Sequence, residues 1–336
     1  MTFDVRRVVG GKDATGRDVV LSDGAPPRTL GTEGDHGVSE VFWLDAPARD
    51  ARDGGDPAGD FQLQPPPGGI ACRAIRLAPP APGATGDERW LRVPGDNPSE
   101  PGMHTTDTVD FIVVLDGKIV LGLDDGEHEL GPGDTVIQRG TRHRWRVVGD
   151  RPCTYAAMML RADASAPAPD VMLAPGTKAG STGLGPRRLV TGTDADGRSC
   201  VIADGEAPRV FTPGEYNNIV IADLWQAGGL VRSADQGGDP DGDFVLDPLG
   251  AGGLAFRFVE MPPGYDPGEA GFHTTTSIDV DVILSGRMGL ALPGEEAIVL
   301  EAGDTVVLRE AAHRWWTVGD EPTQMAALMI RLPDRE

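Results

Sequence analysis

Residues 104–117, HTTDTVDFIVVLDG, and residues 273–286, HTTTSIDVDVILSG, are two versions of one string. Each version begins with histidine, carries aspartate six residues later and ends in glycine. A further histidine follows each string, at His143 and His313. Two histidines and a carboxylate at matched positions form a set of metal ligands. The chain is therefore predicted to build one kind of pocket twice.

The repetition extends over nearly the whole chain. Residues 6–28, RRVVGGKDATGRDVVLSDGAPPR, return at 187–209 as RRLVTGTDADGRSCVIADGEAPR. GGDPAGDF at 54–61 returns as GGDPDGDF at 237–244. The period is far longer than the roughly 20–50 residues of stacked repeat arrays. The sequence therefore indicates duplication of a complete domain.

The 336 residues are enough for two domains with a core in each. A stretch rich in Ala, Pro, Gly, Ser and Thr separates the two copies and is typical of a linker. We expect an N-terminal domain over 1–163, a linker over 164–185 and a C-terminal domain over 186–336.

Each copy has the pattern of short strands joined by tight turns. The chain holds 47 glycines and 29 prolines, which favour turns over long helices. VDFIVVLDGKIVLGL at 109–123 is two runs of β-forming residues around a glycine turn. Few windows show the apolar spacing of an amphipathic helix. An all-β sandwich or barrel is expected in each half.

Charge and composition exclude some classes of partner. The formal net charge is −22, so the surface repels phosphate backbones and anionic lipid. We therefore expect no nucleic-acid and no membrane partner. The first residues, MTFDVRRVVGG, lack the apolar segment of a signal peptide, and no run approaches the roughly 18 apolar residues of a membrane helix. A cytoplasmic location is the expectation.

These motifs resemble those of the cupin superfamily, and the duplication makes the chain similar to a bicupin. The resemblance implies two tandem cupin jelly-roll barrels, also called double-stranded β-helices, related by internal duplication. The residues that carry it in the first copy are His104, Asp110, Gly117, Gly133, Gly140 and His143, and those in the second are His273, Asp279, Gly286, Gly303 and His313.

The chain departs from the cupin pattern at several positions. Thr106 and Thr275 stand where the family has the second histidine of His-x-His, and aspartate replaces the usual glutamate. In the second copy, Glu310-Ala311-Ala312 replaces the Pro-x-Gly turn. Similar strings occur in small cupins associated with secondary-metabolism or catabolic gene clusters.

The remaining ligands form a two-histidine, one-carboxylate set in each copy. This set is typical of non-haem Fe(II) sites with open coordination positions. Fe(II) is the first choice of metal, and Zn(II) or Mn(II) are alternatives. The other interpretation is a metal-free pocket in which aspartate and histidine hydrogen-bond each other. The predicted metal ligands are His104, Asp110, His143, His273, Asp279 and His313.

Polar and aromatic neighbours complete the predicted pockets. Thr106 and Thr275 are poor metal ligands and are assigned as hydrogen-bond donors in catalysis. Trp145 and Trp315 lie two residues past a motif histidine, so on a strand they share its face. Each indole is expected either to plug the core or to form a flat wall for an aromatic substrate.

Arg73 and Arg257 occupy matched positions on the strand that precedes the first motif. They are expected either to form salt bridges or to bind a substrate carboxylate through their fork of donors. Gln138, which becomes Leu308 in the second copy, is a further candidate for substrate binding.

One substitution separates the two copies most clearly. Ile112 in the first copy becomes Asp281 in the second, two residues past Asp279 and on the same strand face. A second inward carboxylate is costly to bury unless it is protonated or paired. Asp281 is therefore a candidate general acid or base, with its pKa raised by Asp279. Alternatively, it faces a wet barrel mouth or an interface.

The sequence favours a bicupin metalloenzyme that acts on a small organic molecule, with an aromatic or polyketide-like body. Its chemistry would be that of an Fe(II) oxygenase or of a metal-assisted cyclase or isomerase. The alternative is a metal-free bicupin that binds small molecules or serves as a scaffold. A homodimer is the expected assembly on general grounds.

Overall fold

The computed structural model describes residues 4–31, 36–93, 95–166, 185–212, 218–240 and 250–332. In these segments the chain consists almost entirely of β-strands, with short 3-10 helices η1 (Gly86–Arg89) and η2 (Gly268–Gly271). The predicted all-β fold is confirmed. Most of the predicted linker over 164–185 lies outside the described residues. No helix in the described segments is long and apolar enough to cross a membrane.

The two repeats give the same order of strands. The strands of the first repeat are β1 (Arg7–Lys12), β2 (Asp18–Gly24), β3 (Arg28–Gly31), β4 (Gly37–Leu44), β5 (Ile70–Leu77), β6 (Thr108–Asp116), β7 (Ile119–Leu123), β8 (Gly126–Leu130), β9 (Thr135–Arg139), β10 (Arg144–Val147) and β11 (Cys153–Arg161). The strands of the second are β12 (Arg188–Thr193), β13 (Ser199–Gly205), β14 (Arg209–Phe211), β15 (Val220–Ala227), β16 (Leu254–Met261), β17 (Ser277–Ser285), β18 (Arg287–Ala291), β19 (Ile298–Glu301), β20 (Thr305–Arg309), β21 (Arg314–Thr317) and β22 (Thr323–Arg331).

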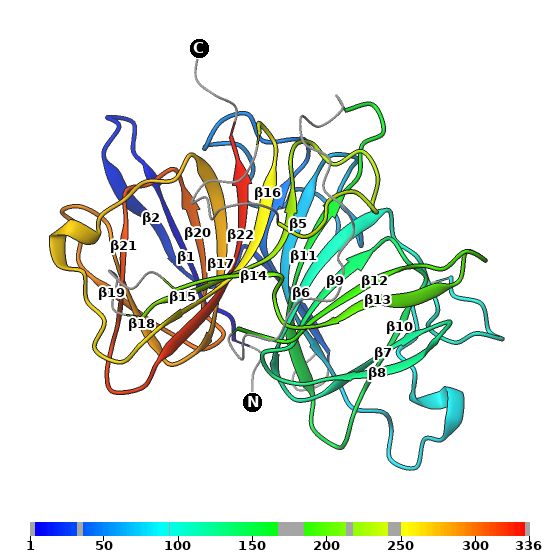
Figure 1. Ribbon diagram of the computed structural model, residues 1–336. Helices are drawn as coiled ribbons and strands as arrows, with labels where there is room; N and C mark the ends of the chain where they lie inside the picture. The colour runs from blue at the N-terminus through cyan, green and yellow to red at the C-terminus, as the bar shows by residue number, and fades with distance from the viewer. Residues whose placement is uncertain are drawn as a thin grey trace.

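Two barrels lie side by side, each made of one large and one small sheet (Figure 1). The large sheets have eight strands, and the small sheets have the orders β10-β7-β8 and β19-β18-β21. The largest hydrophobic cluster takes residues from both large sheets, so it joins the barrels. At its centre the rings of Phe111 and Phe256 lie 5.2 Å apart. Two further clusters fill the barrel interiors.

Strand β6 shows why the motif is apolar on both faces. Val109, Phe111 and Val113 pack into the cluster between the barrels. Ile112 and Val114 alternate with them and pack inside the first barrel. Asp110 shares the inward face, so the sheet carries this carboxylate into the barrel.

The large sheets exchange hairpins between the repeats. The β1–β2 hairpin of the first repeat pairs in parallel with β20 of the second barrel. The β12–β13 hairpin of the second repeat pairs in parallel with β9 of the first barrel. Each large sheet therefore contains strands from both repeats, which the sequence did not indicate. The division at 163 and 186 stays a prediction about the repeats, because the sheets cross it.

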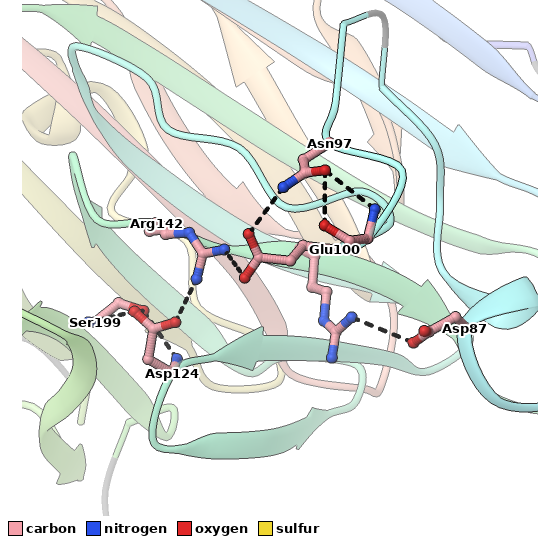
Figure 2. Close-up of polar contacts among 8 residues, drawn as sticks. Asp87, Asn97, Glu100, Asp124, Arg142 and Ser199 are labelled. Carbon is pink, nitrogen blue, oxygen red and sulfur yellow. Dashed lines mark hydrogen bonds and ion pairs between the residues drawn. The ribbon is translucent and has the colours of Figure 1, made fainter.

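A polar network fastens one exchanged hairpin to the first barrel (Figure 2). Ser199 on β13 donates its backbone N–H and its hydroxyl to Asp124, each at 2.9 Å. Asp124 also forms an ion pair with Arg142 at 2.5 Å. Arg142 in turn pairs with Glu100, which accepts from Asn97 at 3.4 Å. The loop before the first motif is thereby linked to the second repeat.

The turn after β9 and the matching turn after β20 differ in sequence, but both have a residue in the left-handed region. Gly140 has φ 59°, in the left-handed region that favours glycine. Glu310 occupies the matching turn with φ 50°. The loss of the cupin Pro-x-Gly sequence therefore leaves the backbone path intact, at the cost of some strain at Glu310.

The exchange predicts that the repeats cannot fold separately. Residues 1–166 alone would lack the β12–β13 hairpin and would expose the cluster that joins the barrels. We expect this fragment to aggregate or self-associate, and co-expression with 185–336 to give a one-to-one complex. Size-exclusion chromatography with light scattering checks the result. A monomeric fragment that unfolds cooperatively would contradict it.

Candidate active site

Paired histidines mark the same place in both barrels. His104 and His143 exchange backbone hydrogen bonds of 3.0 and 2.9 Å, and their ring centroids lie 4.3 Å apart. His273 and His313 repeat this arrangement, with centroids 4.4 Å apart. Each pair joins the segment just before β6 or β17 to the segment just before β10 or β21. The structure thus brings together the histidines that the sequence paired.

The surroundings of the four rings fix which nitrogen is free. Each Nδ1 lies 2.8 or 2.9 Å from the carbonyl oxygen two residues earlier in the chain. A carbonyl only accepts, so Nδ1 carries a proton, and in a neutral ring Nε2 then keeps its lone pair. Burial, and then the partner histidine, lower the pKa of His143 and of His313 to about 3. These two imidazoles are neutral at physiological pH.

Each buried histidine has an indole beside it. Trp145 meets the ring of His143 edge-on with centroids 5.8 Å apart, and Trp315 does the same with His313. This confirms the expected placement two residues along the strand. Trp145 also stacks on Tyr155 at 6.1 Å inside the first barrel. Both indoles belong to the interior clusters of their barrels, and Trp315 also lines a cavity.

The motif carboxylates have different partners in the two copies. Asp279 accepts hydroxyl hydrogen bonds from Thr275 at 2.9 Å and from Ser277 at 2.6 Å. In the first copy, Thr108 donates instead to Thr106 at 2.9 Å, and Oδ1 of Asp110 is buried without a hydrogen-bond partner. Burial raises the pKa of Asp110 to about 7, against the opposing effects of Thr108 and Arg73.

The predicted metal sets are only partly assembled. The neutral imidazoles with free Nε2 atoms fit a metal, because a ligating histidine normally donates its other N–H to a carbonyl or carboxylate. Among the described residues, however, no group of three or more His, Cys, Asp and Glu side chains could hold a metal ion. The carboxylates do not complete the set, so metal binding stays a prediction.

A cavity of about 620 Å³ lies in the second barrel. Its size and mixed lining are typical of sites for small organic ligands. The apolar wall includes Phe211, Ile219, Val259, Met261, Trp315, Met325 and Met329. The polar side groups in the lining are Arg257, His273, Thr275, Asp279, Asp281 and His313.

Asp281 contributes a second carboxylate to this cavity. It is 3% exposed, and burial followed by the charge of Asp279 raises its pKa well above the ordinary value. In the first barrel the equivalent Ile112 packs into the interior cluster. Asp281 thus lies in the lining of the cavity, and its role as an acid or base stays a prediction.

Arg73 and Arg257 lie in buried ion networks. All three guanidinium nitrogens of Arg73 have acceptors: Glu40 at 3.0 Å through Nη2, and the carbonyl oxygens of Gln62 and Leu63. The salt-bridge alternative therefore describes Arg73. Arg257 donates to Asp223 at 2.5 Å and also lines the cavity.

Sequence reasoning missed the carboxylates that hold these arginines. Glu40 is bound by Arg28 and Arg73, and Asp223 is bound by Arg209 and Arg257. The four new residues occupy matched positions in the repeat, which was the available signal.

Gln138 differs from its expected role. It is fully buried, and its amide donates to the carbonyl oxygen of Thr141 at 3.1 Å. Leu308 replaces it in the second barrel and joins the interior cluster. Gln138 thus stabilises the turn before His143 in this structure, and its role in substrate binding stays a prediction.

Comparison with known proteins finds a family match in the first half of the chain. The Cupin_2 family, described as a cupin domain, matches residues 90–159. The chain is 56% identical over 45 residues to phomopsin biosynthesis cluster protein D of Diaporthe leptostromiformis. That match covers 13% of this chain and 24% of the relative, so the chain spans about a quarter of its length.

Two longer matches cover more of the chain. A cupin-domain-containing oxidoreductase, fogC of Aspergillus ruber, is 25% identical over 156 residues, or 44% of this chain and 71% of the relative. The crystal structure of AerE from Microcystis aeruginosa matches with a TM-score of 0.45 and 12% identity, over 91% of this chain and 97% of that one. The Cupin_2 match identifies a cupin domain at residues 90–159, and the second half of the chain repeats the motifs of that region.

Proposed function

We propose that the chain is a biosynthetic enzyme whose second barrel performs the chemistry on a small organic molecule. The observation that carries this proposal is the cavity of about 620 Å³, where apolar walls converge on carboxylates and imidazoles. The names of two relatives, a biosynthesis cluster protein and a cupin-domain oxidoreductase, support the same setting.

The lining of the cavity supports a substrate with a large apolar body and one polar end. Trp315 and the methionines Met261, Met325 and Met329 offer flat and adaptable apolar surfaces. An aromatic or polyketide-like skeleton matches these surfaces. A carbonyl or enol group matches the carboxylates and imidazoles at the polar end.

The carboxylates support acid–base chemistry of the isomerase or cyclase type. Burial, and then the charge of Asp279, raise the pKa of Asp281, which favours its protonated form as a proton donor to a carbonyl oxygen. Two hydroxyl donors, from Thr275 and Ser277, stabilise the ionised form of Asp279, which suits a base. Two carboxyl groups with opposite protonation states would then act on one enolisable centre.

Metal-dependent oxidation is the second candidate. It is favoured by the free Nε2 atoms of the histidine pairs and by the likeness to an oxidoreductase. A bound divalent ion, Fe(II) before Zn(II) or Mn(II), would supply Lewis acidity or oxygen chemistry. The lack of a third close ligand among the described side chains counts against it.

Hydrogen exchange tests the acid–base proposal without a known substrate. A panel of aromatic ketones and β-diketones in D₂O should show enzyme-accelerated exchange of α-protons by NMR. Replacing Asp281→Asn should slow the exchange about 100-fold or more, because it removes the acid but keeps the shape.

The matched control lies in the first barrel. His143→Ala should leave the exchange rate within about twofold of wild type, because that residue belongs to the other pocket. Equal rates for Asp281→Asn and wild type would contradict the assignment. No acceleration with any member of the panel would favour a binding or scaffold role.

Metal loading separates the two candidates. After incubation with Fe(II), Zn(II) or Mn(II) and gel filtration, we expect less than about one ion per ten chains by elemental analysis, since the ligand sets are incomplete. Near-stoichiometric loading that is lost in His273→Ala would contradict this expectation. If the loaded protein also takes up oxygen, metal-dependent oxidation becomes the favoured function.

The buried Asp110 predicts a dependence of stability on pH. Because its folded pKa of about 7 lies above the unfolded value, its contribution to the free energy of unfolding is greatest below about pH 4 and is lost as pH rises through about 7. Asp110→Asn should remove this loss and be more stable than wild type at pH 8, by on the order of a few kcal/mol.

Urea unfolding at pH 4.5 and pH 8 measures the effect. The matched variant Asp279→Asn should be destabilised instead, because the amide has one acceptor oxygen and can accept from only one of Thr275 and Ser277. Unchanged pH dependence in Asp110→Asn would rule out this explanation.

A further inference from the structure

A second cavity, of about 330 Å³, lies where the exchanged hairpin of the first repeat meets the second barrel. Strands β1, β2, β4 and β20 and the loop at 54–56 contribute to its lining. Arg7, Phe42, Asp56 and Arg309 are the side chains that give it its character. It is separate from the cavity inside the second barrel, since the two share no lining residue.

Two guanidinium groups from different repeats line this junction. Arg7 is 7% exposed and donates to the carbonyl oxygen of Val41 at 3.1 Å and to Asp56 at 2.9 Å. Arg309 donates to the carbonyl oxygen of Gly54 at 2.5 Å. These bonds use Nη1 of Arg7 and Nη2 of Arg309, so Nη2 of Arg7 and Nη1 of Arg309 remain as donors beside the cavity.

The positive charges are close enough to oppose each other. Burial, and then the charge of Arg7, lower the pKa of Arg309, while Asp56 and Asp53 act in the opposite direction. The Asp56 side chain is 66% exposed. Asp53 accepts from the backbone N–H groups of Arg49 and Asp50 and does not line the cavity. Solvent weakens the compensation that these carboxylates give.

The duplicate junction has the same arginines beside a larger aromatic ring. Arg188 binds Asp239 at 2.6 Å and the carbonyl oxygen of Leu224 at 2.8 Å, as Arg7 binds Asp56 and Val41. Arg139 is the counterpart of Arg309 and lies 5.5 Å from the centre of the indole ring of Trp225. Trp225 is fully buried and replaces the smaller ring of Phe42.

We propose that the junction cavity binds a small oxyanion, a carboxylate or a phosphate, between Arg7 and Arg309. Guanidinium groups match the planar and tetrahedral oxygens of these anions. A bound anion would offset the repulsion between the two arginines and would tie the exchanged hairpin to the second barrel. The inference does not depend on the reaction proposed for the other cavity.

Calorimetric titration of the full chain with inorganic phosphate and with citrate, at constant ionic strength in chloride, tests the site. We expect saturable binding of at least one of the two anions, and their relative affinities distinguish phosphate from carboxylate chemistry. Phe42→Trp should weaken binding at least tenfold, because it keeps both arginines and places a larger ring in the lining of the cavity.

Arg309→Gln provides a second variant in case Phe42→Trp does not fold. It should also weaken anion binding at least tenfold. The matched control Arg139→Gln should bind like wild type, because Arg139 lies at the duplicate junction beside Trp225 and not at the cavity. No saturable binding of either anion, or equal affinity in wild type and in the folded Phe42→Trp or Arg309→Gln variant, would overturn the proposal.

Discussion

The parallel pairing of each N-terminal hairpin with the other repeat is the constraint on which the structure depends. Strand β1 completes the sheet that holds β20, and β12 completes the sheet that holds β9. The exchange brings the large sheets face to face and buries the apolar cluster between them. Burial of this kind contributes roughly 25 cal/mol per Å² of apolar surface. The barrels are consequently one folding unit, although the sequence has two repeats.

Within this symmetric frame, the two interiors have diverged through few substitutions. Ile112 packs in the core of the first barrel, whereas Asp281 lines the cavity of the second. The change of Thr108 to Ser277 accompanies a different hydroxyl pattern, in which Asp279 gains two donors. The shared backbone presents similar histidine pairs to two unlike environments.

Much of the fold was predictable because it follows from local patterns. Alternation along β6 and β17 identified the inward face, and it correctly placed Trp315 beside His313 and Asp281 inside the barrel. The exchange was not predictable, because the β1–β2 hairpin has the same local pattern whichever barrel it joins. The partners of Arg73 depend on its register against β4, which no local pattern specifies. The positions of the motif carboxylates depend on nearby hydroxyl groups and on burial, which the identity of the residues does not specify. Whether they join the histidines around a metal could therefore not be predicted from the sequence.

The exchanged hairpins also bear on the history of the molecule. A single copy of this repeat could complete its large sheet only with a hairpin from another copy, as in a symmetric homodimer. In such a dimer any substitution would appear in both pockets at once. A single polypeptide removes that coupling, so Asp281 can stand in one barrel while Ile112 keeps the other barrel packed. The two pockets can therefore differ although their large sheets share strands.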